Sequence, residues 1–320
     1  MNTMSLLFYS MLIFSTLLAF SSNNWFQLWA ALEVNMMVFI PIMFNKNNLS
    51  IMSMIKYFIF QSSASIIFLL SNLSSFSNLS NVWINLFIMM SMSIKLGMAP
   101  IYFWLPQMIE GLNWLNMTIL LTWQKLIPLF IISCMTFNTK LNSVIIIISA
   151  MLGSLMMIKQ TSLRKLLAYS SITHMAWILF LITNQSMYWT FYFICYSILS
   201  VLIYFFMKTH NLSSLFEGLY TLNFNNKILL MTIFMSISGL PPFLGFYPKW
   251  MALNMAYNSA LFVIVFLILS SLINIFIYLR ISYPLIMSKT MMNKSSKIKN
   301  YNLFMMNLMS LIIFIPLMKL

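Results

Sequence analysis

Five ionisable residues lie inside long apolar stretches of this sequence: Glu33, Lys95, Lys125, His174 and Lys249. In a membrane an ionised side chain costs roughly 2.5–3.5 kcal/mol on insertion scales, so such residues pair with another group or line a wet cavity. Desolvation favours the neutral form of a buried amine, and imidazole exchanges protons near neutral pH. These residue types therefore favour proton transfer across a membrane as the chemistry of this chain.

Each of these residues also has a simpler interpretation. Lys125 and Lys249 could extend their ammonium groups to the membrane surface, because lysine side chains are long and flexible. Glu33 could form a static pair with Lys95, its best partner in the sequence. His174 could be a hydrogen-bonded packing residue. The sequence leaves these alternatives open.

The composition is that of an integral membrane protein. Of the 320 residues, 62% are hydrophobic and 6% are charged, whereas soluble domains carry about 25% charged residues. The net charge is +14, but there is no polar domain that could hold nucleic acid. The sequence contains no G-x-G-x-x-G, G-x-x-x-x-G-K-[ST] or C-x-x-C motif, so it predicts no nucleotide, iron–sulfur or other metal site on this chain.

We expect an all-α, polytopic fold in a single membrane domain over residues 1–320. Apolar stretches of about 20 residues, the length of a membrane-spanning helix, can be placed eleven times. They are Thr3–Phe20, Trp25–Phe44, Met52–Leu70, Val82–Ile109, Leu115–Phe137, Leu141–Ile158, Lys165–Ile182, Met187–Met207, Ile228–Met251, Asn258–Ser282 and Tyr301–Met318.

The distribution of lysine and arginine supports this order of spans. The opposite side from the N-terminus holds Lys140 and Lys319. The loops and helix ends on the N-terminal side hold twelve basic residues, namely Lys46, Lys56, Lys159, Arg164, Lys165, Lys208, Lys227, Arg280, Lys289, Lys294, Lys297 and Lys299. Basic residues accumulate on the side that is not translocated, so we expect the N-terminus there.

Glycine and proline interrupt the fourth and the ninth span. The first break follows Lys95 near Pro100, and the second lies near Pro241, ahead of Lys249. Proline removes a helical hydrogen bond, and irregular backbone in a membrane survives only where protein buries it or water reaches it. Paired breaks five spans apart predict two inverted five-helix repeats, 3–137 and 141–282, followed by a loop over 283–300 and a helix over 301–318. Two unrelated proline kinks are the alternative.

Several segments resemble one family of respiratory proteins. KLGMAPIYFWLPQMIEGLNW (Lys95–Trp114) looks like the signature of antiporter-like proton-pumping subunits. QTSLRKLLAYSSITHMAW (Gln160–Trp177) and SGLPPFLGFYPKW (Ser238–Trp250) look like the chain 2 family of mitochondrial NADH:ubiquinone oxidoreductase, respiratory complex I. WAALEVN around Glu33 agrees, and the resemblance covers essentially the whole chain.

The resemblance implies a subunit of the membrane arm of complex I in the mitochondrial inner membrane, with its N-terminus in the matrix. It implies a proton path formed by Glu33 paired with Lys95, a connecting Lys125 and a terminal Lys249. NADH, FMN, iron–sulfur clusters and ubiquinone would be bound by other subunits. The implied partners are neighbouring antiporter-like and small membrane-arm subunits and structural phospholipids, not nucleic acid.

Two other functions stay open at this point. A free-standing sodium/proton antiporter would have similar apolar spans, although this sequence has no aspartate to help coordinate sodium. A passive membrane scaffold would contain the same charged residues without using them.

Overall fold

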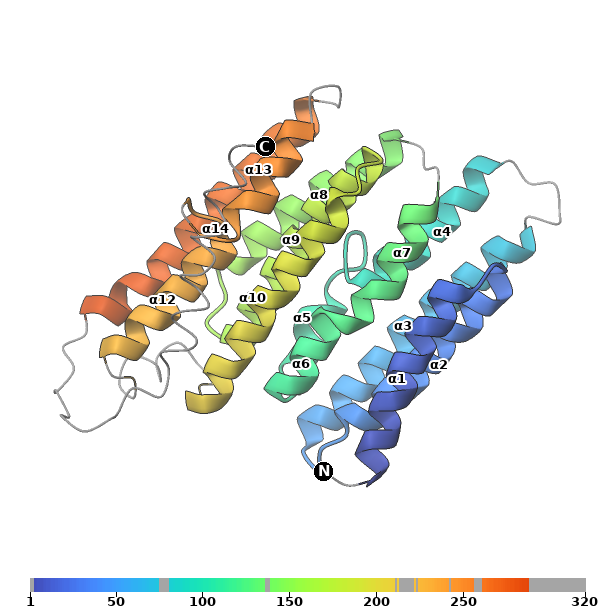
Figure 1. Cartoon of the computed structure of the whole chain (residues 1–320), viewed down its shortest axis with the longest axis horizontal. Helices are drawn as coiled ribbons and strands as arrows, with labels where there is room; N and C mark the ends of the chain where they lie inside the picture. Colours follow the sequence, from blue (N-terminus) through green and yellow to red (C-terminus); the bar gives the residue numbers. More distant parts are fainter. Residues whose placement is uncertain are drawn as a thin grey trace. The chain divides into compact units, whose positions relative to one another are not determined.

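The computed structural model describes residues 3–74, 81–135, 139–210, 212, 222, 224–241, 243–255 and 261–287. The regular elements in these ranges are helices (Figure 1). The chain divides into two compact units, Met1–Ser149 and Ala150–Leu320. The division falls within α8 (Thr139–Met157), which joins the two units.

The first unit is arranged around α3. Its helices are α1 (Thr3–Ser21), α2 (Trp25–Met43), α3 (Asn48–Ser74), α4 (Asn81–Leu96), α5 (Trp104–Ile109), α6 (Trp114–Leu121), the 3₁₀ turn η2 (Trp123–Lys125) and α7 (Leu126–Cys134). α3 packs against α2, α4 and α5, and α7 packs against α1 and α4. α3 therefore contacts both the helix that carries Glu33 and the helix that carries Lys95.

The second unit is arranged around α9 and α10. Its other described helices pack against this pair: α10 contacts α12 and α13, and α14 contacts α9 and α12. The bounds are α9 (Leu163–Thr183), α10 (Tyr188–His210), α12 (Phe224–Ser238), α13 (Phe246–Asn254) and α14 (Leu261–Met287). α9 is buried along most of its length, so its polar side chains must find partners inside the protein.

The helices agree with the expected membrane spans in the part of the chain that the structure describes. Seven of them are long and apolar enough to cross a membrane, and three shorter apolar helices lie at Val82–Leu96, Leu141–Met157 and Asn226–Ser238. The span expected at Tyr301–Met318 lies outside the described residues, as does most of the loop predicted over 283–300. The total of eleven spans and the inverted relation of the repeats stay predictions.

The predicted end of the second repeat, Ser282, lies inside a helix. α14 runs to Met287 and does not end at Ser282, because the residues that follow are still apolar and the helix accommodates Pro284. The first five residues of the predicted loop, 283–287, are therefore helical.

Both predicted helix breaks are present. α4 ends at Leu96 and α5 begins at Trp104, while α12 ends at Ser238 and α13 begins at Phe246. In each case a glycine follows the first helix directly, and a proline is the third residue of the second helix, where its missing N–H costs no helical bond. The two interruptions are thus built on one local pattern.

Candidate proton-transfer site

The first break ends α4 with a Schellman motif. Gly97 has a φ of 71°, in the left-handed region that favours glycine. The N–H of Gly97 donates to the carbonyl of Ile94 at 3.0 Å, and the N–H of Met98 donates to the carbonyl of Ser93 at 2.9 Å. This pair of bonds is the Schellman pattern, so the helix ends at a defined residue within the apolar interior.

Two side chains also donate hydrogen bonds to carbonyl groups in the last turn of α4. The indole N–H of Trp104 donates to the carbonyl of Ile94 at 3.1 Å. The amide of Gln61, on α3, donates to the carbonyl of Lys95 at 3.4 Å. Lys95 itself is only 6% exposed and lies in the last turn of α4. The partial negative charge at a helix C-terminus stabilises a cation there.

Glu33 lies midway along α2 and is half-buried. Its carboxylate is close enough to act electrostatically on the Lys95 ammonium. Among the described residues, no direct ion pair or hydrogen bond joins the two side chains. The role of Glu33 and Lys95 as a working pair stays a prediction.

The second break brings Lys249 to the end of α12. Gly239 has a φ of 80°, and the same two backbone bonds close the helix, from Gly239 to Ser236 at 3.2 Å and from Leu240 to Met235 at 3.3 Å. Lys249 is 7% exposed, and its Nζ donates to the carbonyl of Ser238 at 2.7 Å. The ammonium thus binds a C-terminal carbonyl of α12.

Lys125 lies at a third interruption, which the sequence analysis did not predict. It is the last residue of η2, between α6 and α7, and it is 2% exposed. Pro128 has no N–H to donate to the carbonyl of Gln124, so the helical ladder loses a bond at this turn. Pro128 was the available signal, but a proline alone does not distinguish a bend from a 3₁₀ turn.

The three lysines share one structural setting. Lys95, Lys125 and Lys249 are each buried and each lie at an interruption in apolar helical structure. Extension of an ammonium to the membrane surface requires exposure, so their burial argues against the surface-anchor interpretation. Glu33, Lys95 and Lys125 belong to the first unit, and Lys249 belongs to the second.

His174 lies in a buried polar region of the second unit. It is 4% exposed, and its Nδ1 is 2.9 Å from the hydroxyl of Tyr192 on α10. Its ring centroid is 5.2 Å from that of Tyr196. A hydrogen bond between imidazole and phenol can hold the ring in place and can also exchange a proton, so both interpretations of His174 keep a structural basis.

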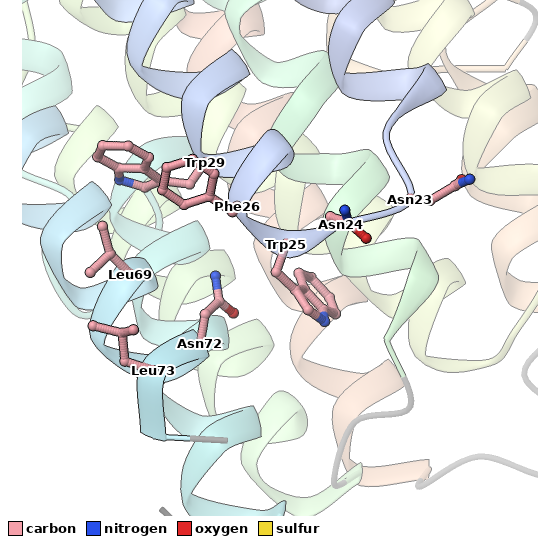
Figure 2. A pocket seen from close by; sticks show the side chains of 8 residues that line it. All are labelled: Asn23, Asn24, Trp25, Phe26, Trp29, Leu69, Asn72 and Leu73. Carbon is pink, nitrogen blue, oxygen red and sulfur yellow. The ribbon is translucent and has the colours of Figure 1, made fainter. Parts of the chain in front are cut away.

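A surface pocket of the first unit lies apart from these residues. It has a volume of about 420 Å³ and is lined by Asn23, Asn24, Trp25, Phe26, Trp29, Leu69, Asn72 and Leu73. Figure 2 shows that its walls come from the start of α2 and the end of α3. Tryptophan with small polar residues is typical of a membrane interface. None of the five predicted site residues lines this pocket.

Four polar residues that the sequence did not single out lie in or contact the lysine-bearing segments. They are Asn35 on α2, Tyr57 and Gln61 on α3, and Gln124 in η2. Each is a hydrogen-bonding residue within an apolar stretch, which was the available signal. Neutral polar side chains are common in membrane helices, so only their hydrogen-bond partners in the fold indicate whether they have a functional role.

Comparison with known proteins places the chain in a family. Residues 22–274 match the family described as NADH:quinone oxidoreductase/Mrp antiporter, TM. NADH-ubiquinone oxidoreductase chain 2 of Anopheles gambiae is 39% identical over 308 residues, which cover 92% of this chain and 90% of the relative. The protein of the same name from Locusta migratoria is 38% identical over 295 residues, covering 89% and 86% of the two chains.

Solved structures share the fold at low sequence identity. A chain of respiratory complex I from Thermus thermophilus superposes with a TM-score of 0.84 at 18% identity, over 99% of this chain and 78% of that chain. A chain of the Mrp complex from Dietzia sp. superposes with a TM-score of 0.76 at 14% identity, over 85% and 58%. From its match to the family and its identity to these relatives, the chain belongs to the NADH-ubiquinone oxidoreductase chain 2 family of antiporter-like membrane proteins.

Proposed function

We propose that this chain is a membrane-arm subunit of respiratory complex I in the mitochondrial inner membrane. It contributes a proton-translocation path that is coupled to electron transfer from NADH to ubiquinone in other subunits. One observation carries the proposal: Lys95, Lys125 and Lys249 are each buried at an interruption of an apolar helix. Buried charge and irregular backbone are both costly in a membrane, and together they are typical of an ion pathway.

The first step of the path is the opening and closing of the Glu33–Lys95 pair. Two unit charges about 4 Å apart at an effective dielectric of about 20 interact by about 4 kcal/mol. Closing the pair therefore stabilises the protonated lysine, and opening it changes the proton equilibrium by roughly three orders of magnitude. The arrangement of the two residues, interacting without a direct bond, suits a pair that can move between these states.

The later steps use Lys125 and Lys249. Lys125 receives the proton from the Lys95 region through water and polar side chains. Lys249 is the terminal group, and the carbonyl of Ser238 holds its ammonium in place. We include His174 as a relay candidate in the second unit, because its imidazole is hydrogen-bonded to the hydroxyl of Tyr192.

Other chains complete the reaction in this proposal. NADH, FMN, iron–sulfur clusters and ubiquinone bind to them, and this chain acts as a partner of neighbouring antiporter-like and small membrane-arm subunits. Structural phospholipids cover its exposed apolar faces, such as those of α1 and α14.

The test is the variant Lys125→Met in the assembled complex, reconstituted in sealed vesicles. Electron transfer from NADH to a quinone and proton movement are measured on the same sample. We expect the number of protons moved per electron to fall, because methionine keeps the length of the side chain and removes its proton. Lys208→Met is the matched control, since Lys208 is an exposed lysine at the end of α10.

The outcomes separate the three functions. Unchanged proton movement per electron in Lys125→Met would show that the chain is a passive scaffold. Sodium-driven proton exchange by the isolated chain, without any electron-transfer subunit, would identify a free-standing antiporter.

A further inference from the structure

Three neutral polar side chains form a cluster next to Lys125. The amides of Asn35 and Gln124 bond reciprocally, with Asn35 Nδ2 donating to Gln124 Oε1 at 2.9 Å and Gln124 Nε2 donating to Asn35 Oδ1 at 3.3 Å. The hydroxyl of Tyr57 donates to the same Gln124 Oε1 at 3.3 Å. We call these residues the amide cluster. It joins α2, α3 and η2.

The amide cluster lies at a turn where the helical ladder lacks one hydrogen bond. Gln124 directly precedes Lys125 in η2, and its own carbonyl lacks the helical donor that Pro128 cannot supply. Tyr57 is 2% exposed and Asn35 is 3% exposed, so water does not compete for most of these bonds. In a low-dielectric setting satisfied side-chain bonds are strong and fix the geometry of the segment they hold.

The same face of α3 contacts both lysine-bearing interruptions of the first unit. Tyr57 and Gln61 are four residues apart, which places them on one side of the helix. Tyr57 bonds to Gln124 beside Lys125, and Gln61 bonds to the carbonyl of Lys95. One rigid helix therefore sets the positions of both segments.

A comparable bond occurs in the second unit. Asn274 on α14 donates to the hydroxyl oxygen of Thr173 on α9 at 2.9 Å. In the predicted repeats, α2 and α9 are the second helices, and the α6–α7 segment and α14 are the fifth helices. Each unit thus uses a buried side-chain bond between these two positions, although the residues differ.

We propose that Asn35, Tyr57 and Gln124 are positioning residues for proton exchange at Lys125. This inference rests on the proposed function. The cluster fixes the 3₁₀ turn and ties it to α2, the helix of Glu33, and to α3, the helix that bonds the Lys95 segment. Amides do not readily release protons, and the hydroxyl of Tyr57 donates its hydrogen to Gln124 Oε1. The cluster therefore acts by holding Lys125 in place and not by carrying the proton itself.

The experiment compares three variants of the assembled complex in sealed vesicles: Asn35→Leu, Gln124→Met and Tyr57→Phe. In Tyr57→Phe we expect the rate of proton movement to fall roughly two- to tenfold, the factor that the loss of one buried hydrogen bond produces. The fall should be larger in Asn35→Leu and Gln124→Met, which remove two and three of the cluster's hydrogen bonds. Tyr57→Phe removes only the hydroxyl and keeps the ring contacts with Phe39 and Trp104. It therefore keeps the test valid even if the other two variants do not assemble.

Asn116→Leu is the matched control. Asn116 is a 6% exposed asparagine on α6 that donates to the carbonyl of Ile42 on α2 at 2.9 Å. It links the same part of the unit to α2, but its hydrogen bond does not involve η2. We expect Asn116→Leu to keep its number of protons moved per electron.

The swapped variant Asn35→Gln with Gln124→Asn tests the role of the amide pair directly. It restores two facing amides with the same total side-chain length, so we expect it to recover proton coupling that Asn35→Leu and Gln124→Met lose. If the single variants match the control and the swap changes nothing, the positioning role is wrong. Lys125→Met separates the two proposals. Normal proton movement in Lys125→Met overturns the proposed function. Loss of proton movement in Lys125→Met, with normal proton movement in Tyr57→Phe, overturns only the positioning role.

Discussion

The ammonium of Lys249 donates a 2.7 Å hydrogen bond to the carbonyl of Ser238, eleven residues earlier in the sequence. Lys249 lies in the first turn of α13, the second half of a broken helix, and Ser238 is the last residue of α12, the first half. The break thus supplies an acceptor for a buried cation at the negative end of a helix. A lysine that lacks an acidic partner in the sequence still has a polar partner in the fold.

We predict that Lys249→Met uncouples proton movement from electron transfer more strongly than Lys249→Arg. Methionine cannot donate to Ser238, whereas arginine keeps a donor but does not release its proton. In Lys249→Met we expect the rate of proton movement that accompanies electron transfer to fall by roughly tenfold or more, because a positioned proton donor typically contributes about 10²–10⁴-fold. Protons and electrons are counted together in vesicles. Equal coupling in Lys249→Met and the wild type contradicts the prediction.

Gly239→Ala should disturb Lys249 as well as the backbone. A Cβ atom at this position would lie 2.9 Å from the Lys249 Nζ and 3.0 Å from the carbonyl oxygen of Gly245. The positive φ adds a cost of roughly 1–2 kcal/mol. We expect lower thermal stability together with a loss of proton coupling.

Gly97→Ala is the control for Gly239→Ala. It has the same backbone strain, with a φ of 71°, but its Cβ would meet the side chain of Leu105 and no ammonium. We expect a similar loss of stability and a smaller loss of proton coupling. If proton coupling falls equally in Gly97→Ala and Gly239→Ala, backbone strain alone explains both losses.

Glu33→Gln and Lys95→Met should interact as a pair. We expect the double variant to be no worse than the worse single variant, with an interaction energy of roughly 0.5–3 kcal/mol on the proton-coupled rate. The reason is that each single change removes the same electrostatic contact. Glu110→Gln, a change at the end of α5, serves as the control for loss of a carboxylate. Strictly additive effects mean that the two residues act independently.

The orientation in the membrane can be measured by labelling. Lys46 and Asn23 are both exposed and lie at opposite ends of α2. In a Cys134→Ser background, which removes an exposed thiol, we expect an impermeant thiol reagent to label Lys46→Cys from the matrix side only. Asn23→Cys should be labelled from the other side only. Reversed labelling means that the N-terminus was assigned to the wrong side, and labelling of both from one side means that the order of spans is wrong.

The sequence alone determined which residues are unusual and where two of the three helix interruptions lie. Glu33, Lys95, Lys125 and Lys249 stand out because charge is rare and costly in apolar stretches. Gly97 and Gly239 end helices for a local reason, since glycine adopts a positive φ without strain. Such features depend on one residue or on a few neighbours, so they can be read along the chain.

The tertiary structure decided the partners. Asn35 and Gln124 are 89 residues apart, and Gln61 lies 34 residues before the carbonyl it bonds. Apolar periodicity shows that a helix crosses the membrane, but in a bilayer nearly all positions are apolar and the pattern does not reveal which face meets which helix. Only packing could bring the amide cluster beside Lys125, because a side-chain hydrogen bond depends on atoms within about 3 Å and not on sequence distance.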